Sequence, residues 1–286
     1  MDEEVRHRSL NNGVGELSGL PLEGRYRLKE LLGRGGMGEV YRAEQVLAGR
    51  DVALKVLRRE RIADERAAGR FVQEIRALAS QHGLPICSMT INHSTGNLLD
   101  SGPERDRAVE DTVFGLETAA QLGAPCTLHT LGRFSSDLYY DDAYHNAVDS
   151  LKALAPACEK LDVALAFEFV WNGFLFSPME VKRFLDDVGS RHIGFYFDPG
   201  NMAVFQFPHH WVRIIGSHIK RVHLNDWKGR ALNGEWTPLL EGEVDFGKVM
   251  AELRAAGYEG PLVSEVSPSL ASLQDTVKVM QKIREM

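Results

Sequence analysis

The sequence predicts an α/β protein in which an incomplete (β/α)8 TIM-type barrel of about six βα units follows a small β-sheet and a helix. Two observations lead to this prediction. From residue 83 onwards, short apolar segments alternate regularly with longer segments of helical periodicity, which is typical of parallel βαβ units. The preceding residues instead show strand-like alternation around a glycine-rich turn, followed by one charged helix. Because a closed barrel needs eight βα units, about two are missing at the N-terminal side of this region.

The composition is that of an ordinary globular protein, and it excludes several functional classes. Hydrophobic residues make up 44% of the chain and the formal net charge is -7, so there is no basic excess with which to bind nucleic acid or an anionic membrane. No apolar run is long enough to span a bilayer. The first residues are acidic and lack the apolar segment of a secretory signal. Cys87, Cys126 and Cys158 are odd in number and have no CxxC spacing, so we expect reduced thiols in a cytoplasmic protein.

The change in sequence texture divides the chain into three parts. Residues 1–22 are polar, contain glycine and lack periodicity, which predicts a disordered leader. Residues 23–80 are expected to form the small β-sheet and its helix, and residues 81–286 the barrel region. We expect the join to fall inside a helix, around residues 71–83.

The first structured part is organised around a glycine-rich turn between two expected strands. Gly33, Gly35 and Gly38 have the G-x-G-x-x-G spacing. Because this turn lies between two strands rather than before a helix, it argues against a dinucleotide-binding site of the Rossmann type. A further strand carries Lys55, and the charged helix after it carries Glu74.

These features, in this order, resemble the N-terminal lobe of a bacterial Ser/Thr protein kinase over about residues 24–79. The resemblance implies that the glycines would cover the phosphates of ATP, that Lys55 would contact the α- and β-phosphates, and that Glu74 would pair with Lys55. It ends there, because no His-Arg-Asp catalytic loop follows and the Asp-Phe-Gly at 245–247 belongs to a different pattern. We therefore expect neither kinase activity nor ATP as a cofactor, and we favour a structural remnant. A nucleotide-binding or regulatory module is the alternative.

The rest of the chain alternates between expected strands and expected helices. The strands are short and apolar, and they comprise residues 83–90, 124–130, 163–168, 193–198, 219–223 and 262–265. The helices have apolar residues at helical spacing, and they comprise residues 104–123, 141–161, 177–188, 209–215, 245–256 and 269–283. This order of elements predicts successive parallel βαβ units.

Four of the expected strands end in a side chain that can bind a metal ion. The run IGFYFD over 193–198 breaks at once into Pro-Gly-Asn, so Asp198 stands at the carboxyl end of a buried strand. Three other strands end in Glu168, His223 and Glu265. Because the carboxyl ends of barrel strands meet at one rim, these side chains are expected to converge. Oxygen and imidazole ligands suit Mn, Mg, Co or Fe rather than a thiolate-preferring metal, although each residue taken alone also fits a helix cap or a surface group.

The region from about residue 83 to residue 286 resembles the sugar-phosphate isomerase/epimerase family, which has a xylose-isomerase-like barrel. The similarity is closest to ketose 3-epimerases and the related hexulose-phosphate isomerases. The motifs that carry it are EFVWN at 168–172, SP at 177–178, YFDPGN at 196–201, RVHLND at 221–226, LEGEVD at 240–245 and GPLVSE at 260–265. Together these motifs are specific for the family but not for a substrate.

The family resemblance implies a divalent metal ion (Mn, Mg or Co, with Fe as a further candidate) held by Glu168, Asp198, His223 and Glu265. A proton on the carbon next to a ketose carbonyl is too weakly acidic to leave unaided, and a bound cation would stabilise the resulting enediolate. Glu168 and Glu265, on opposite sides of the sugar, would act as base and acid. The implied function is a metal-dependent isomerase or epimerase of a ketose or ketose phosphate.

Candidates for substrate contacts are Trp171, Asn172, Asn201 and Arg230. Asn201 stands three residues after Asp198, where the family often has a histidine, and an amide can hydrogen-bond to a sugar but cannot titrate near neutrality. Trp171 fits a core residue equally well, and Arg230 fits a solvated surface cation. Asp226 would either orient the metal-binding histidine or cap a turn.

A barrel that lacks about two units leaves open sheet edges and part of its wall missing. A fusion protein without catalytic activity is therefore a further alternative, and the open edges favour a homo-oligomer. The expected partner is a small-molecule sugar or sugar phosphate, not nucleic acid or a membrane.

Overall fold

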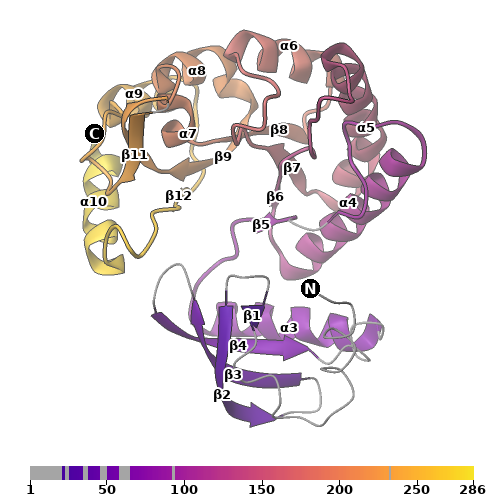
Figure 1. The fold of residues 1–286 in the computed structure, drawn as a ribbon, viewed down its shortest axis with the longest axis vertical. Helices are drawn as coiled ribbons and strands as arrows, with labels where there is room; N and C mark the ends of the chain where they lie inside the picture. Colours follow the sequence, from indigo (N-terminus) through magenta and orange to yellow (C-terminus); the bar gives the residue numbers. More distant parts are fainter. Residues whose placement is uncertain are drawn as a thin grey trace. The chain divides into compact units, whose positions relative to one another are not determined.

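The computed structural model describes residues 21–22, 26–34, 38–45, 50–57, 65–91, 94–231 and 233–286. The chain divides into two compact units. The first comprises Met1–Glu74 with Ser267–Ser269, and the second comprises Ile75–Val266 with Leu270–Met286 (Figure 1). The expected disordered leader lies outside the described residues except for its last two, which form a short strand. The domain boundaries derived from the sequence stay predictions.

The first unit contains a four-stranded antiparallel sheet. Its strands, hydrogen-bonded in this order, are β1 (Pro21–Leu22), β2 (Tyr26–Arg34), β3 (Gly38–Gln45) and β4 (Arg50–Leu57). Gly33 lies near the end of β2 and Gly38 begins β3, whereas Gly35 lies outside the described residues. In this register Gly33 and Lys55 both lie opposite Val40. The glycine-rich segment therefore lies between two neighbouring antiparallel strands, as the sequence predicts.

Helix α3 (Glu65–Gln81) follows the sheet and carries Glu74. The side chain of Lys55 lies outside the part of the chain whose side chains are described. The pairing of Lys55 with Glu74 therefore stays a prediction.

The second unit is an open half-barrel with a parallel sheet. Its six strands are β5 (Met89–Thr90), β6 (Cys126–His129), β7 (Ala164–Phe167), β8 (Ile193–Phe197), β9 (Ile219–Leu224) and β12 (Leu262–Ser264). Their order in the sheet is β12-β9-β8-β7-β6-β5, and every pairing is parallel. Among the described strands no ladder joins β5 to β12, so both are edges. The prediction of an incomplete barrel of six βα units is confirmed.

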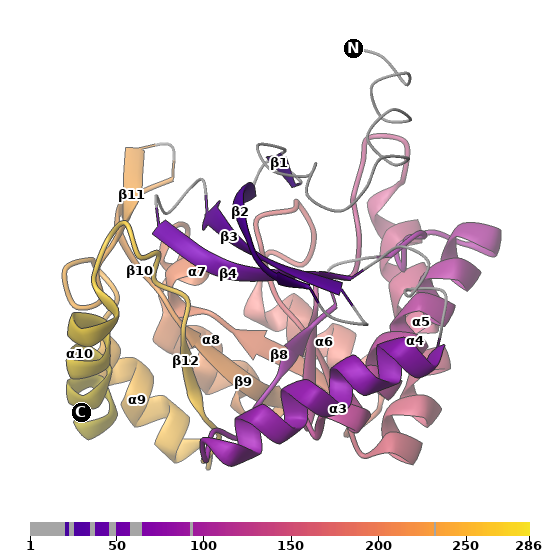
Figure 2. The same cartoon turned by 90° about the horizontal axis from the view of Figure 1, so that it is seen from below.

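Helices pack on the outer side of this sheet. They are α4 (Gly102–Leu122), α5 (Tyr140–Leu161), α6 (Pro178–Val188), α8 (Pro208–Ile215), α9 (Phe246–Ala255) and α10 (Leu273–Glu285). Figures 1 and 2 show them following one another around the strands. None of the described helices combines the length and the apolar character needed to cross a lipid bilayer.

The alternation of side chains along β8 decides which residues face the inside of the half-barrel. Phe195 and Phe197 are buried in the large core cluster that the sheet forms with the helices. Tyr196 belongs instead to a small separate cluster with side chains of β6 and β7. Because side chains of a strand alternate between its two faces, Asp198 lies on the same inner side as Tyr196.

Two expected elements are shorter than the sequence suggested. The expected strand over 83–90 is reduced to Met89–Thr90, an edge strand that pairs only with β6 among the described strands. The expected helix over 269–283 begins later, because the side chain of Ser272 accepts a hydrogen bond from the backbone N–H of Asp275 and caps the helix there.

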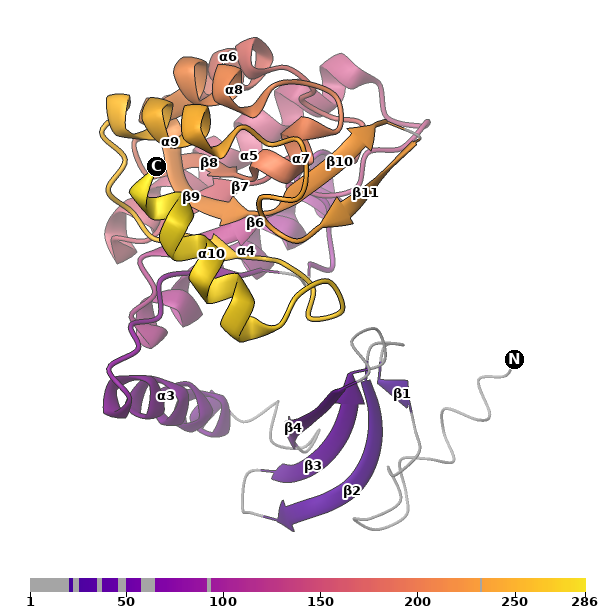
Figure 3. The ribbon, with the colours of Figure 1, turned by 90° about the vertical axis from the view of Figure 1, so that its left-hand side faces the viewer.

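Further elements were not expected from the sequence. They are α7 (Pro199–Ala203), the 3-10 turn η1 (Gly216–His218), and an antiparallel hairpin of β10 (Asp226–Arg230) and β11 (Asn233–Thr237). The hairpin lies beside α7 (Figure 3). It follows β9 directly, so it stands at the carboxyl end of the parallel sheet.

All three cysteines are free thiols, as expected. Cys126 and Cys158 are buried and Cys87 is half-buried. Burial raises the pKa of Cys126 to about 11 and that of Cys158 to about 12. Both buried thiols are therefore protonated at neutral pH and act as small apolar side chains.

Candidate metal centre

Four side chains meet at the carboxyl ends of the half-barrel strands. Glu168 directly follows β7, Asp198 follows β8 and Glu265 follows β12, whereas His223 is the next-to-last residue of β9. One potential ligand atom from each residue lies within 4.8 Å of those of the other three. The structure thus brings together all four residues that the sequence singled out, and we call them the strand-end cluster.

Backbone hydrogen bonds extend the parallel ladder one step beyond the strands and hold two of these residues in place. The backbone N–H of Glu168 donates to the carbonyl of His129 at 3.2 Å, and that of Glu265 donates to the carbonyl of Leu224 at 3.3 Å. Glu265 is therefore tied to the end of β9, although its own strand is an edge of the sheet.

Asp198 is held by the helix that follows it. Its side chain is completely buried, and Oδ1 accepts hydrogen bonds from the backbone N–H groups of Gly200 at 2.7 Å and Asn201 at 3.2 Å. These groups belong to the first turn of α7, so Asp198 is a helix cap. It is also a member of the strand-end cluster, so the two interpretations offered by the sequence apply together.

Burial and mutual repulsion shift the pKa values of the cluster. Burial raises the pKa of Glu168 to about 7; a hydrogen bond with His223 opposes this, and the charges of Asp198 and Glu265 add to it. Burial also raises the pKa of Asp198. For His223, burial lowers the pKa, but the carboxylates of Glu168 (3.3 Å from Nδ1) and Glu265 (3.5 Å) outweigh it, so the pKa is raised. A bound cation would relieve this crowding of carboxylates.

The donor set fits one divalent ion. It offers three carboxylate oxygens and one imidazole nitrogen, which are ligand types that Mn, Mg, Co, Fe and Zn accept. With metal–ligand bonds of about 2.0–2.6 Å, ligand atoms around one ion lie up to about 5 Å apart. The spread of 4.8 Å within the cluster agrees with this geometry.

Two asparagine amides hold the carboxylates of the cluster. Asn201 Nδ2 donates to Glu168 Oε1 at 3.2 Å. Asn225 Nδ2 donates to Asp198 Oδ2 at 2.8 Å and to Glu265 Oε2 at 3.1 Å. The sequence analysis predicts Asn201 as a substrate contact and makes no prediction for Asn225. The one feature of the sequence that points to Asn225 is its position two residues after His223, on the segment that leaves the end of β9.

Trp171 lies beside Trp227 and Trp236, which the sequence analysis does not predict as site residues. Its indole N–H donates to the carbonyl of Asn201 at 3.0 Å, and its ring stacks on Trp236 with centroids 5.3 Å apart. Trp227 packs edge-on against both rings. Trp171 is 37% exposed, so the core-packing interpretation is wrong. The two others stand in the segments DWKGR and NGEWT, which are two residues apart and lack the Asn-Gly type of turn between them that would predict a hairpin.

The structure places the remaining sequence-predicted residues in other local contacts. Arg230 is 68% exposed and pairs with the carboxylate of Glu243 at 3.2 Å. Asn172 accepts a weak hydrogen bond from the backbone N–H of Phe174 at 3.4 Å. The carboxylate of Asp226 accepts hydrogen bonds from three backbone N–H groups, those of Trp227, Gly242 and Val244. Of its two predicted roles, Asp226 therefore has the turn-capping one.

A fifth strand, β6, ends in a potential metal ligand, but this histidine makes a hydrogen bond to the backbone instead. His129 closes β6 and is buried; its Nδ1 accepts a hydrogen bond from the backbone N–H of Leu131 at 2.9 Å. Leu131 has a left-handed backbone with φ of 65°, which this bond helps to hold. Burial lowers the pKa of His129 to about 4. The ring is therefore neutral at pH 7, with its acceptor nitrogen engaged.

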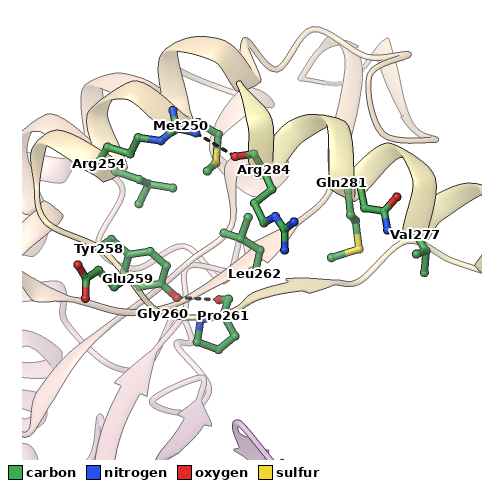
Figure 4. Close-up of a pocket in the computed structure, with 12 residues that line it drawn as sticks. Met250, Arg254, Tyr258, Glu259, Gly260, Pro261, Leu262, Val277, Gln281 and Arg284 are labelled. Carbon is green, nitrogen blue, oxygen red and sulfur yellow. Dashed lines mark hydrogen bonds between the residues drawn. The ribbon is translucent and has the colours of Figure 1, made fainter. Parts of the chain in front are cut away.

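A groove of about 570 Å³ lies elsewhere, between α9, α10 and the segment before β12 (Figure 4). Its floor is apolar and includes Met250, Leu262 and Val277. Two arginines line it, and Arg254 donates to the carbonyl of Arg284 at 2.9 Å. None of the strand-end cluster lines this groove, so it is not part of the candidate metal centre.

The N-terminal part of the chain is similar to bacterial protein kinases. It is 51% identical over 61 residues to the serine/threonine-protein kinase pkn2 of Myxococcus xanthus, and 36% identical over 95 residues to pkn3 of the same organism. These matches cover 21% and 33% of the chain. The chain spans only 7% of the first kinase and 16% of the second, so the similarity concerns a fragment of each.

The half-barrel is similar to several solved structures. A xylose isomerase domain protein from Planctomyces limnophilus aligns with a TM-score of 0.63 and 19% identity, over 76% of this chain and 83% of that one. A D-tagatose 3-epimerase-like protein aligns with a TM-score of 0.65 and 20% identity, over 76% and 82%. The IOLI protein, described with a binding zinc atom, aligns with a TM-score of 0.60 and 12% identity, over 76% and 83%. At these identities the likeness shows the fold.

The family assignment rests on a longer match. Residues 45–283 match the family described as the xylose isomerase-like TIM barrel. This range contains all six parallel strands and the whole strand-end cluster. The chain belongs to the xylose isomerase-like TIM barrel family, and it joins a six-stranded half-barrel of that type to a fragment similar to bacterial Ser/Thr protein kinases.

Proposed function

We propose that this protein is a divalent-metal-dependent isomerase or epimerase of a ketose or ketose phosphate. The observation that carries the proposal is the convergence of three carboxylates and one imidazole within 4.8 Å at the carboxyl rim of the sheet. The solved structures with the same fold include one described as D-tagatose 3-epimerase-like, which supports the choice of a ketose as the substrate class.

The strand-end cluster would hold the ion, for which Mn, Mg and Co are the leading candidates and Fe a further one. When bound, the ion would polarise the substrate carbonyl and a neighbouring hydroxyl, and so make the proton on the carbon next to the carbonyl more acidic. Asp198 and His223 come from β8 and β9, the two strands between the two glutamates. They would hold the centre of the site, with one glutamate on each side.

Glu168 and Glu265 would carry the proton. One removes it from the carbon beside the carbonyl to leave an enediolate, and the other returns a proton to that carbon or its neighbour. Their surroundings differ, because Glu168 is buried with a pKa raised to about 7 by burial, whereas the Glu265 side chain is 54% exposed on the edge strand.

Four further residues would line the substrate site. Trp171 and Asn201 are linked by a hydrogen bond, and Asn201 also contacts Glu168, so both would lie next to the reacting carbon. Asn172 lines a small cavity together with Glu168. Arg230 would reach a substrate phosphate only after leaving its ion pair with Glu243.

The test is an isotope-exchange assay. Protein stripped with a chelator and reloaded with Mn is incubated in D2O with a panel of ketoses and ketose phosphates, and deuterium at C1 and C3 is measured by NMR. We expect exchange with at least one substrate, dependent on the added metal. Well-folded, metal-loaded protein that catalyses no exchange with any member of the panel would contradict the proposal.

A further inference from the structure

Asn225 connects two carboxylates that come from strands on opposite sides of β9. It follows β9 by one residue, and β9 lies between β8 and β12 in the sheet. Its side-chain nitrogen lies 2.8 Å from Asp198 Oδ2 and 3.1 Å from Glu265 Oε2. The amide must present its N–H₂ group to the two carboxylates, because its oxygen has no proton to donate. One side chain thus uses both of its N–H bonds on the strand-end cluster.

The two carboxylates differ in how firmly the fold holds them. Asp198 is completely buried and is also fixed by the backbone N–H groups of α7. The Glu265 side chain is 54% exposed, on a strand whose outer edge pairs with no described strand. Its described polar contacts are His223, at 3.5 Å, and Asn225. The Asn225 amide therefore ties the exposed carboxylate to the buried one.

Close packing holds Asn225 in this position. A Cβ atom placed on Gly200 would lie 2.6 Å from Asn225 Cβ and 2.7 Å from a ring carbon of Trp236. Both distances are shorter than van der Waals contact, so the absence of a side chain at Gly200 is what lets Asn225 and the tryptophan approach α7. Asn225 itself is buried, with 9% exposure.

We propose that Asn225 is a positioning residue of the metal centre, which holds Glu265 and Asp198 at the separation that one ion requires. This inference rests on the proposed metal site. It assigns Asn225 no contact with the ion or the substrate. Removing a residue that hydrogen-bonds to the metal ligands typically weakens metal affinity by about 10- to 100-fold.

The test measures metal binding to Asn225→Leu, a replacement of similar size that removes both N–H donors. Mn affinity is determined by isothermal titration calorimetry, and the visible absorption of the Co-loaded protein reports the coordination geometry. We expect Mn to bind about 10- to 100-fold more weakly than to the unsubstituted protein, together with a changed Co spectrum. The matched control is Asn233→Leu on the exposed strand β11, which should leave both measurements unchanged.

A second variant tests the same idea without altering Asn225. Gly200→Ala should displace Asn225 by steric contact, and its backbone conformation is one that alanine adopts without strain. We expect weaker Mn binding and a shifted Co spectrum here as well, and this variant decides the matter if Asn225→Leu does not fold. Wild-type affinity and an unchanged spectrum in either folded variant would overturn the inference while leaving the metal site intact. Failure of the unsubstituted protein to bind any metal would overturn both.

Discussion

Replacing Glu168 or Glu265 by glutamine should reduce metal-dependent deuterium exchange into the substrate by at least about 100-fold, because general acid–base groups typically contribute that much or more. Each glutamate is assigned one side of the proton transfer, and a glutamine amide neither accepts nor returns a proton near neutral pH. The measurement is kcat/KM for exchange, with the substrate found to be active in the panel.

Because both glutamates are also proposed ligands, metal occupancy has to be separated from proton transfer. Each variant is therefore assayed at a Mn concentration at which calorimetry shows the site to be filled. The matched control is Glu235→Gln, an exposed glutamate of β11 that lies outside the strand-end cluster, and it should retain full exchange. If the metal-filled Glu168→Gln variant exchanged deuterium at the wild-type rate, Glu168 would not be the proton-transfer group, and the same reasoning applies to Glu265.

Replacing Asp198 by asparagine should weaken Mn binding by more than about 100-fold. This loss is larger than that expected for residues that only hydrogen-bond to the ligands. The change removes a negative charge from the centre of the cluster but keeps an oxygen that can cap α7, since asparagine is among the best helix caps. The fold should therefore persist, and calorimetric titration with Mn measures the loss directly.

Thermal unfolding with and without Mn gives an independent check on Asp198→Asn. Burial raises the pKa of Asp198, so its ionised form is disfavoured in the metal-free fold, and removing the charge should offset the loss of the hydrogen bond from Asn225. The metal-free variant should therefore unfold at a temperature close to that of the wild type. Added Mn should stabilise the wild-type protein by linkage and leave the variant nearly unchanged. An equal rise in the unfolding temperature of both proteins would show that the ion binds elsewhere.

The half-barrel could be predicted from the sequence because its strands have strong local signals. The run that ends in Asp198 is apolar throughout and stops at a proline and a glycine, which marks both the burial and the end of the strand. In a parallel sheet the same signal on neighbouring strands means that their ends meet at one rim. This is why Glu168, Asp198, His223 and Glu265 can be grouped from the sequence alone, and the structure brings one ligand atom of each within 4.8 Å of the others.

The residues that support the cluster could not be found in this way. Asn225 directly follows β9, but the strand expected from the sequence ends at His223, and the role of Asn225 depends on the positions of two carboxylates that are 27 and 40 residues distant in sequence. Trp236 reaches Trp171 through a hairpin whose strands are short and polar. His129 ends a strand as the four do, yet its ring is turned to the backbone of Leu131. These outcomes depend on tertiary packing, which a local pattern does not contain.

The N-terminal unit could be predicted from its similarity to a known type of protein. Its glycine spacing and strand order pointed to a kinase-type lobe, and the high identity to bacterial kinases over 61 residues agrees with this. No His-Arg-Asp catalytic loop follows this part in the sequence. The candidate metal ligands lie in the half-barrel.

The proposed function requires an open, six-stranded half-barrel to hold one catalytic divalent ion between four strand ends. The most direct test is X-ray diffraction from Mn-loaded crystals at wavelengths on either side of the Mn absorption edge. We expect one anomalous peak per chain, at bonding distance from Glu168, Asp198, His223 and Glu265. Loaded crystals with no anomalous peak at this position, or with Mn held only by other side chains, would contradict it.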